Sequence, residues 1–294
     1  MQQFIANASE KYHYPMEEIE TIITAFQEFM RSRIEQPEQE EPLCPDMPGL
    51  EHVTIPRGIT LVYGHPDVGK TAFVCGILAS IGPSYTAAYL DTEAKASKVT
   101  LSNLNARTLY TKDYVDSGLK DMVTRGLLDV VVVDSITALY ASSQHAFLRT
   151  ISKNVPYVIC AAQTRTDISK KKQVPAIVED AYSMIHAIIR LTEKERVNLE
   201  GETLYRVYYS VEKNIHHDSG AAKGAFVIYK GAYDAYLTAY DILKNNGIVR
   251  SIGGVKYLTA EDGSEQCLGK IMKPQQETRN LILTTYARWA RRCQ

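Results

Sequence analysis

The sequence predicts an α/β protein built around a mainly parallel sheet. Between residues 59 and 163, short runs of β-branched, aromatic and other apolar residues alternate with helical stretches. Such continuously apolar runs are typical of parallel strands that are covered on both faces. After residue 180, longer runs follow one another through charged turns without an intervening helix, which indicates antiparallel strands that extend the sheet.

The order of the elements follows from these runs. The first half is expected to form strands at the segments ITLVYG, TAAYLD, DVVVVDS and YVICAAQ. Helices are expected at TAFVCGILAS, near 115–125 and near 137–153. The later strands are expected at AYSMIHAIIRLTEK, ETLYRVYYSVEKN and GAFVIYK. A helix at roughly 233–246, a glycine-rich hairpin IVRSIGGVKYL and a C-terminal helix follow.

These elements divide into three expected regions. A small N-terminal helical element with its linker covers residues 1–45, an α/β core covers 46–235, and a small α+β region covers 236–294. In the first region, apolar side chains at steps of three and four predict an amphipathic helix, namely Met16, Ile19, Ile23, Phe26, Met30 and Ile34. The acidic, proline-rich stretch behind it is typical of a linker. We expect this helix to serve in oligomerisation or in docking a protein partner.

The composition excludes several classes of protein. A chain of 294 residues with 45% hydrophobic and 23% charged residues is typical of an ordinary globular protein. No apolar run approaches the roughly 18 residues that span a bilayer, and no signal peptide is evident, so a cytoplasmic location without membrane contact is expected. Five scattered cysteines without a CxxC pair suggest neither disulfides nor zinc. With a net charge of −1, any nucleic-acid contact must come from local basic patches.

A phosphate-binding loop lies between the first predicted strand and the first predicted helix. The segment GHPDVGKT has the P-loop pattern, in which backbone N–H groups and a helix N-terminus surround phosphate oxygens. Its lysine is expected to reach the β- and γ-phosphates and its threonine to hold Mg²⁺, so ATP with magnesium is the expected ligand. The expected nucleotide-binding residues here are Gly64, His65, Pro66, Asp67, Val68, Gly69, Lys70, Thr71 and Ala72.

Three further polar residues stand at or just past the ends of predicted strands. Asp134 follows four valines and is the candidate second magnesium ligand, although a strand-end aspartate can also cap the next helix. Glu93 is the candidate for orienting the attacking water, with Asp91 as its competitor. Gln163 is a candidate for sensing the γ-phosphate. Because carboxyl ends of parallel strands share one sheet edge, these side chains are expected to lie together.

In this order, the motifs GHPDVGKT, YLDTEAK, DVVVVDSITALY and VICAAQTR resemble those of the RecA/RadA recombinase superfamily, including phage recombinases of the UvsX type. The similarity continues through YYSVEKNIHHDSG, GAFVIYKG and AYDILKNNGIVRSIGGVKYL, and so covers roughly residues 55 to 260. The resemblance implies a RecA-like P-loop ATPase core. It also implies a homo-oligomeric filament on single-stranded DNA that pairs it with homologous duplex DNA, in recombination and repair, and hydrolyses ATP between subunits.

The resemblance also assigns roles to single residues. Lys213 matches the lysine that reaches the γ-phosphate of the neighbouring subunit's nucleotide, as an arginine finger does. Ile215 stands where the family has its second lysine, so His216 or Lys223 would have to complete that contact. Tyr229 matches a ring that packs against the nucleotide base.

The family's DNA-binding loops differ here. The first is nearly absent, because the segment ITALYASSQHAFLRTI passes directly into a predicted helix. The second spans roughly 164–180 and carries a basic cluster that would neutralise DNA phosphates, namely Arg165, Lys170, Lys171 and Lys172. A solvated surface loop is the alternative for this cluster. A second basic patch surrounds Trp289, for which docking of the C-terminal helix is the favoured interpretation.

Four functions are compatible with these motifs. A RecA-type recombinase is the leading hypothesis, and a RecA-fold accessory ATPase, such as a recombination mediator or RadB-like paralogue, is the second. A hexameric helicase of the DnaB or phage primase-helicase type and a KaiC-type sensor that does not act on DNA are further alternatives. Filaments, rings or isolated particles on single-stranded DNA would distinguish the first three.

Overall fold

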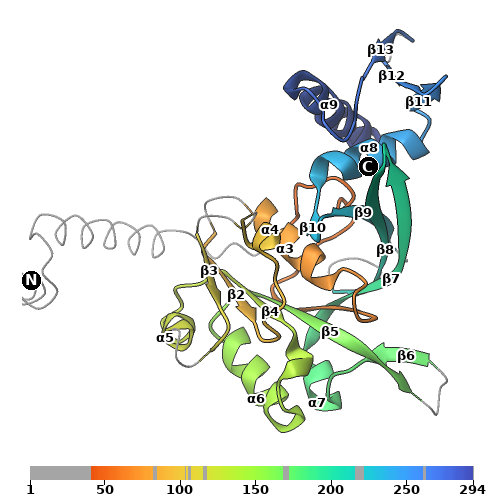
Figure 1. Cartoon of the computed structure of the whole chain (residues 1–294). Helices are drawn as coiled ribbons and strands as arrows, with labels where there is room; N and C mark the ends of the chain where they lie inside the picture. Colours follow the sequence, from red (N-terminus) through yellow and green to blue (C-terminus); the bar gives the residue numbers. More distant parts are fainter. Residues whose placement is uncertain are drawn as a thin grey trace, which may run out of the picture. The chain divides into compact units, whose positions relative to one another are not determined.

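The computed structural model describes residues 41–81, 85–102, 104, 107–114, 118–167, 172–215, 222–260 and 263–293. The predicted N-terminal helix therefore lies outside the described residues. Contacts divide the chain into two units, Met1–Glu41 and Pro42–Gln294. The elements below all belong to the second unit, which Figure 1 shows in colour.

A large mixed sheet forms the centre of this unit. Its strands are β1 (Gly58–Gly64), β2 (Ala87–Asp91), β3 (Thr108–Thr111), β4 (Val130–Asp134), β5 (Tyr157–Asp167), β7 (Ile185–Leu199), β8 (Glu202–Asn214), β9 (Lys223–Tyr229) and β10 (Ala232–Tyr233). They lie in the order β10-β9-β8-β7-β1-β5-β4-β2-β3, and β6 (Lys172–Pro175) pairs only with β5. From β7 through β1 to β3 all neighbours are parallel, whereas β8, β9 and β10 pair antiparallel. This confirms a mainly parallel sheet that antiparallel strands extend.

Helices cover both faces of the parallel half (Figure 1). They are α3 (Lys70–Ser80), α4 (Lys98–Ser102), α5 (Leu119–Thr124), the 3-10 turn η1 (Ile136–Ala138), α6 (Ala141–Ser152) and α7 (Glu179–Tyr182). Alternate strand residues enter two separate cores, one around α3 and the other around α5 and α6. Both faces of the strands are thus buried, which is why their sequences are apolar without interruption.

The direction of β7 corrects one expectation. The run AYSMIHAIIRLTEK was expected to be antiparallel, but β7 is parallel to β1 and antiparallel only to β8. The connection that precedes β7 contains the short helix α7 and returns the chain to the edge of the sheet at which the parallel strands begin. The antiparallel extension therefore begins one strand later than the sequence suggests.

The segment of the predicted second DNA-binding loop contains a β-hairpin. β5 continues past the end of β4 and pairs antiparallel with β6, with Thr164 opposite Pro175 and Asp167 opposite Lys172 (Figure 1). Threonine and valine side chains in this stretch favour the extended backbone of these strands. Lys170 and Lys171 lie outside the described residues, and of Lys172 only the backbone is described.

The C-terminal region packs on the far ends of the antiparallel strands. It contains α8 (Ala235–Asn245), α9 (Gln276–Cys293) and a small sheet of β11 (Val249–Ile252), β12 (Val255–Thr259) and β13 (Glu265–Cys267). α8 and α9 share a core with residues of β7, β8 and β9. Trp289 stacks at 5.8 Å from Tyr286, whose hydroxyl accepts a 2.9 Å hydrogen bond from the Gly49 backbone. These contacts agree with docking of the terminal helix. No helix among the described residues is both long and apolar enough to cross a membrane.

Candidate nucleotide site

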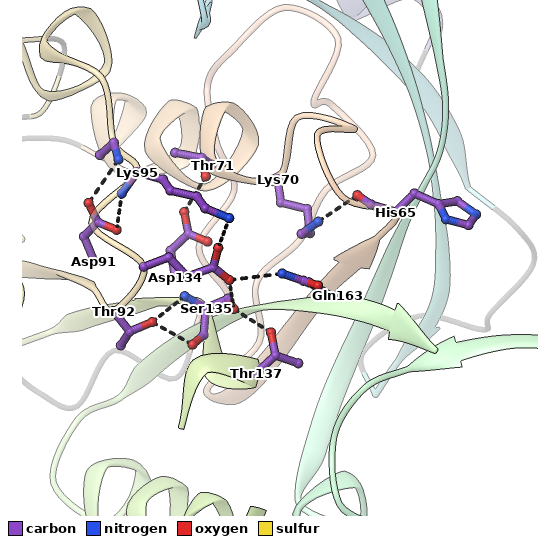
Figure 2. Close-up of polar contacts among 12 residues, drawn as sticks. His65, Lys70, Thr71, Asp91, Thr92, Lys95, Asp134, Ser135, Thr137 and Gln163 are labelled. Atoms are coloured by element: carbon purple, nitrogen blue, oxygen red, sulfur yellow. Dashed lines mark hydrogen bonds and ion pairs between the residues drawn. The ribbon is translucent and has the colours of Figure 1, made fainter. Parts of the chain in front are cut away.

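The strand register brings the predicted motif residues to one edge of the sheet. Gly64 at the end of β1 lies opposite Gln163 of β5, and Asp134 at the end of β4 lies opposite Ala161 of β5 and Asp91 of β2. The loop after β1, the turn after β2 and the start of the segment after β4 therefore face one another. Figure 2 shows the side chains that meet there.

The loop between β1 and α3 needs glycine at both ends of its motif. Gly69, the N-cap of α3, has φ +114°, and a Cβ there would lie 2.5 Å from Cδ1 of Ile228. A Cβ at Gly64 would lie 2.8 Å from the carbonyl oxygen of Leu191. Between them, His65, Pro66 and Asp67 are exposed, whereas Val68 is buried in the core. The first part of the loop thus faces solvent, while the buried side chain of Val68 anchors the loop in the core.

The side chain of Lys70 folds back over this loop. Its ammonium donates to the carbonyl oxygens of Gly64 at 3.1 Å and of His65 at 2.8 Å. Burial lowers the pKa of Lys70, and the negative charges of Asp134 and Glu93 offset that effect only in part. A buried cation with carbonyl acceptors alone is an unfavourable arrangement that an anionic ligand would improve.

Thr71 and Asp134 form the candidate magnesium site. The Thr71 hydroxyl donates to Oδ2 of Asp134 at 2.6 Å, and the Tyr89 hydroxyl donates to the same oxygen at 2.9 Å. Burial raises the pKa of Asp134, against these hydrogen bonds. The described residues contain no group of three or more metal-binding side chains. A hydroxyl and one carboxylate nevertheless fit Mg²⁺, which keeps waters and takes further oxygens from phosphates.

Glu93 is close enough to Asp134 to raise the pKa of that carboxyl, and it belongs to a network of hydrogen bonds. Its Oε1 accepts from the Ser135 hydroxyl at 2.7 Å and from Nε2 of Gln163 at 3.3 Å. Its Oε2 lies 2.6 Å from the ammonium of Lys95. Burial alone would raise the pKa of Glu93, but the hydrogen bonds from Lys95, Ser135 and Gln163 outweigh it and hold that pKa below its ordinary value. Glu93 is therefore an ionised acceptor near neutral pH.

Asp91, the competitor for the water-orienting role, is occupied elsewhere. Its carboxylate accepts backbone hydrogen bonds from Lys95 at 3.1 Å and Ala96 at 3.0 Å, and another from the Tyr110 hydroxyl at 3.1 Å. Only 1% of Asp91 is exposed. It stabilises the turn that carries Glu93, which leaves Glu93 as the carboxylate available to a ligand.

Several residues that contribute here were not singled out from the sequence. Tyr89 and Lys95 belong to a strand and turn that the sequence did identify, but nothing in their spacing reveals their partners. Ser135 directly follows Asp134, and the peptide bond between them is cis. Lys194 of β7 donates to the carbonyl oxygen of Asp67 at 2.8 Å, a contact across 127 residues that has no local sequence signal.

Other predicted residues have different partners within the chain. The ammonium of Lys213 donates to the carbonyl oxygen of Ile185 at 2.5 Å, and Ile215 beyond it is 53% exposed. Tyr229 lies in β9 with the Lys230 ammonium 5.0 Å from its ring centre. Arg165 is exposed on the β5–β6 hairpin, two residues after Gln163, and His216 lies outside the described residues.

No protein-family model and no curated protein sequence matches this chain.

Proposed function

We propose that this protein is a magnesium-dependent ATPase of RecA type that acts on single-stranded DNA as a homo-oligomer and promotes homologous pairing. One observation carries the ATPase part of the proposal: the Thr71–Asp134 pair and the Glu93–Ser135–Gln163 network lie at one sheet edge, beside a loop of P-loop sequence. The action on DNA and the homo-oligomer come from the family resemblance. This arrangement has the parts that phosphoryl transfer to water requires, namely a phosphate cradle, a cation site and a carboxylate.

Each residue then has a defined task. The loop amides and Lys70 bind the phosphates, and Thr71 and Asp134 would hold Mg²⁺, which supplies positive charge at the β- and γ-phosphates. Glu93 orients the attacking water through a carboxylate oxygen. Gln163 donates to Glu93, so a change in its position alters the orientation of that carboxylate.

The β5–β6 hairpin supports an effect of DNA on hydrolysis. Gln163 and Arg165 belong to the same continuous strand, β5, and Thr164 between them lies 3.4 Å from Nδ1 of His65 in the phosphate loop. A polyanion bound at Arg165 would therefore lie on the same strand as residues that contact Glu93 and the loop. The Lys213 ammonium donates to the carbonyl oxygen of Ile185 in its own chain at 2.5 Å, so its proposed role toward a neighbouring subunit rests on the resemblance alone.

An accessory RecA-fold ATPase is the second candidate, and the connection after β4 favours it. β4 ends at Asp134 and α6 begins at Ala141, with only η1 between them. The segment between β4 and α6, where the family has its first DNA-binding loop, is thus too short for a loop of that kind. An accessory ATPase would hydrolyse ATP slowly and form no extended polymers.

The test combines ATP hydrolysis with and without single-stranded DNA and electron microscopy with a slowly hydrolysed ATP analogue. We expect DNA-stimulated hydrolysis and filaments, loss of nucleotide binding in Lys70→Ala, and retained binding without turnover in Glu93→Gln. A rate of ATP hydrolysis that DNA does not change, together with isolated particles in the electron microscope, would favour the accessory function. Normal turnover by Glu93→Gln would refute the assignment of the water-orienting carboxylate.

A further inference from the structure

The ion pair between Lys95 and Glu93 has no evident structural purpose. The ammonium lies 2.6 Å from Oε2 of Glu93, yet the Lys95 side chain is 67% exposed. Exposed ion pairs contribute little to stability, because water competes for both charges and the long side chain loses freedom. The backbone of this turn is held independently, through the bonds from Lys95 and Ala96 to the carboxylate of Asp91.

The ion pair does involve the Glu93 oxygen at which an attacking water would be oriented. Oε1 of Glu93 already accepts two hydrogen bonds, from Ser135 and Gln163, which fills its acceptor capacity. A water can therefore be bound and oriented only at Oε2. Lys95 occupies one of the two acceptor sites of that oxygen and so competes with a water for its orientation.

The Lys95 ammonium also lies on the side of Glu93 that faces the phosphate loop. Besides Glu93, the charges of Asp67 in the loop and of Asp134 raise the pKa of Lys95. Lys95 in turn is the nearby positive charge that contributes to the lowered pKa of Lys70. Figure 2 shows its side chain extending from the turn toward the carboxylates next to Thr71.

We propose that Lys95 is a positioning residue that distinguishes ATP from ADP. Without a terminal phosphate in the loop, Lys95 holds Oε2 of Glu93; when a triphosphate binds, the ammonium moves to the γ-phosphate and releases that oxygen to the water. A lysine suits this exchange because its ammonium is a point charge on a flexible stem. The γ-phosphate carries more negative charge than Glu93 and attracts the ammonium more strongly. The inference rests on the proposed ATPase function and adds the residue that couples the bound nucleotide to Glu93.

The experiment compares Lys95→Met and Lys95→Arg with a matched control, Lys98→Met. Lys98 is an exposed lysine three positions farther along, so its replacement removes the same charge from the same segment. Binding of Mg²⁺ with ATPγS and of Mg²⁺ with ADP is measured by calorimetry for each variant. We expect Lys95→Met to lose about tenfold of the preference for the triphosphate, as the loss of one close charge predicts. Lys95→Arg and Lys98→Met should keep that preference.

The pH dependence of hydrolysis gives a second readout that a purely structural role would not change. The acid limb of kcat/KM reports the free enzyme, in which Lys95 lowers the pKa of Glu93. Lys95→Met should therefore shift that limb to higher pH. The acid limb of kcat reports the complex, in which Lys95 has left Glu93, and should stay in place.

The outcomes separate the two proposals. If Lys95→Met keeps both the wild-type nucleotide preference and the wild-type acid limb, Lys95 is only a surface ion pair and the inference is wrong. Lys70→Ala is expected to lose ATPγS and ADP alike. A wild-type chain that binds neither nucleotide would refute the proposed function, and the inference with it.

Discussion

Replacing Gly69 by alanine tests how closely the phosphate loop is fitted against the antiparallel half of the sheet. Gly69 has φ +114°, a region that side chains rarely adopt, and forcing alanine into it costs about 1–3 kcal/mol. The new Cβ would also lie 2.5 Å from Cδ1 of Ile228, a residue only 4% exposed. Displacing that buried methyl adds about 1 kcal/mol. Gly69→Ala should thus lower the free energy of unfolding by about 2–4 kcal/mol.

A double-mutant cycle isolates the contact from the backbone strain. Ile228→Val removes the Cδ1 atom and alone should cost about 1 kcal/mol. In the Gly69→Ala background it also relieves the clash, so the two changes should cost about 1 kcal/mol less than their sum. Unfolding in denaturant, followed by circular dichroism and extrapolated linearly, measures each free energy.

Gly118→Ala is the matched control for this cycle. Gly118 has φ +75° at the N-cap of α5, but nothing lies within 4 Å of an added Cβ. Gly118→Ala should therefore show strain without coupling to Ile228→Val. Additive costs in the Gly69 cycle, or a Gly69→Ala variant as stable as the wild type, would refute the close fit.

Three further predictions concern the site, the thiols and the hairpin. Tyr89→Phe removes a buried donor to the carboxylate of Asp134 and should lower the free energy of unfolding by about 2 kcal/mol; unchanged stability would contradict the hydrogen bond. Burial raises the pKa of Cys75 and Cys160 to about 12, so their stabilising effect is complete below 9.0 and is lost as pH rises toward 12. At pH 8 a thiol reagent should spare both until the protein unfolds, while it modifies the exposed thiols, Cys44 and Cys267. Replacing Lys170, Lys171 and Lys172 together by alanine should make the plot of log affinity for single-stranded DNA against log salt concentration shallower by a slope of about 2. An unchanged slope would show that these lysines do not contact the DNA.

The parts of the site that the sequence could predict are those that parallel strands bring together by rule. Gly64, Asp134 and Gln163 each end or interrupt an apolar run, and the ends of such runs share one sheet edge. Their pattern was therefore enough to place them side by side. The choice between Asp91 and Glu93 was not predictable, because it depends on hydrogen bonds within a turn and not on spacing.

Two features of strand pairing could not be predicted. The direction of β7 depends on its pairing with the distant strand β1, after a connection through α7, a helix of four residues with no clear period. The β5–β6 hairpin is local, but it has no Asn-Gly or Gly-Gly turn that would mark it in the sequence.

The strands β7 and β9, which lie beyond β1 in the sheet, contact the phosphate loop directly. β7 supplies the carbonyl oxygen of Leu191 against Gly64 and the ammonium of Lys194 to the carbonyl of Asp67, and β9 supplies Ile228 against Gly69. A shift of these strands would therefore displace the loop at Gly64, Asp67 and Gly69. Lys213 stands near the end of β8, between these two strands in the sheet, and would contact a neighbouring subunit in the proposed oligomer. If the proposed oligomer forms through Lys213, this sheet would connect assembly with nucleotide binding, and a variant that loosens the fit at Gly69 should weaken both.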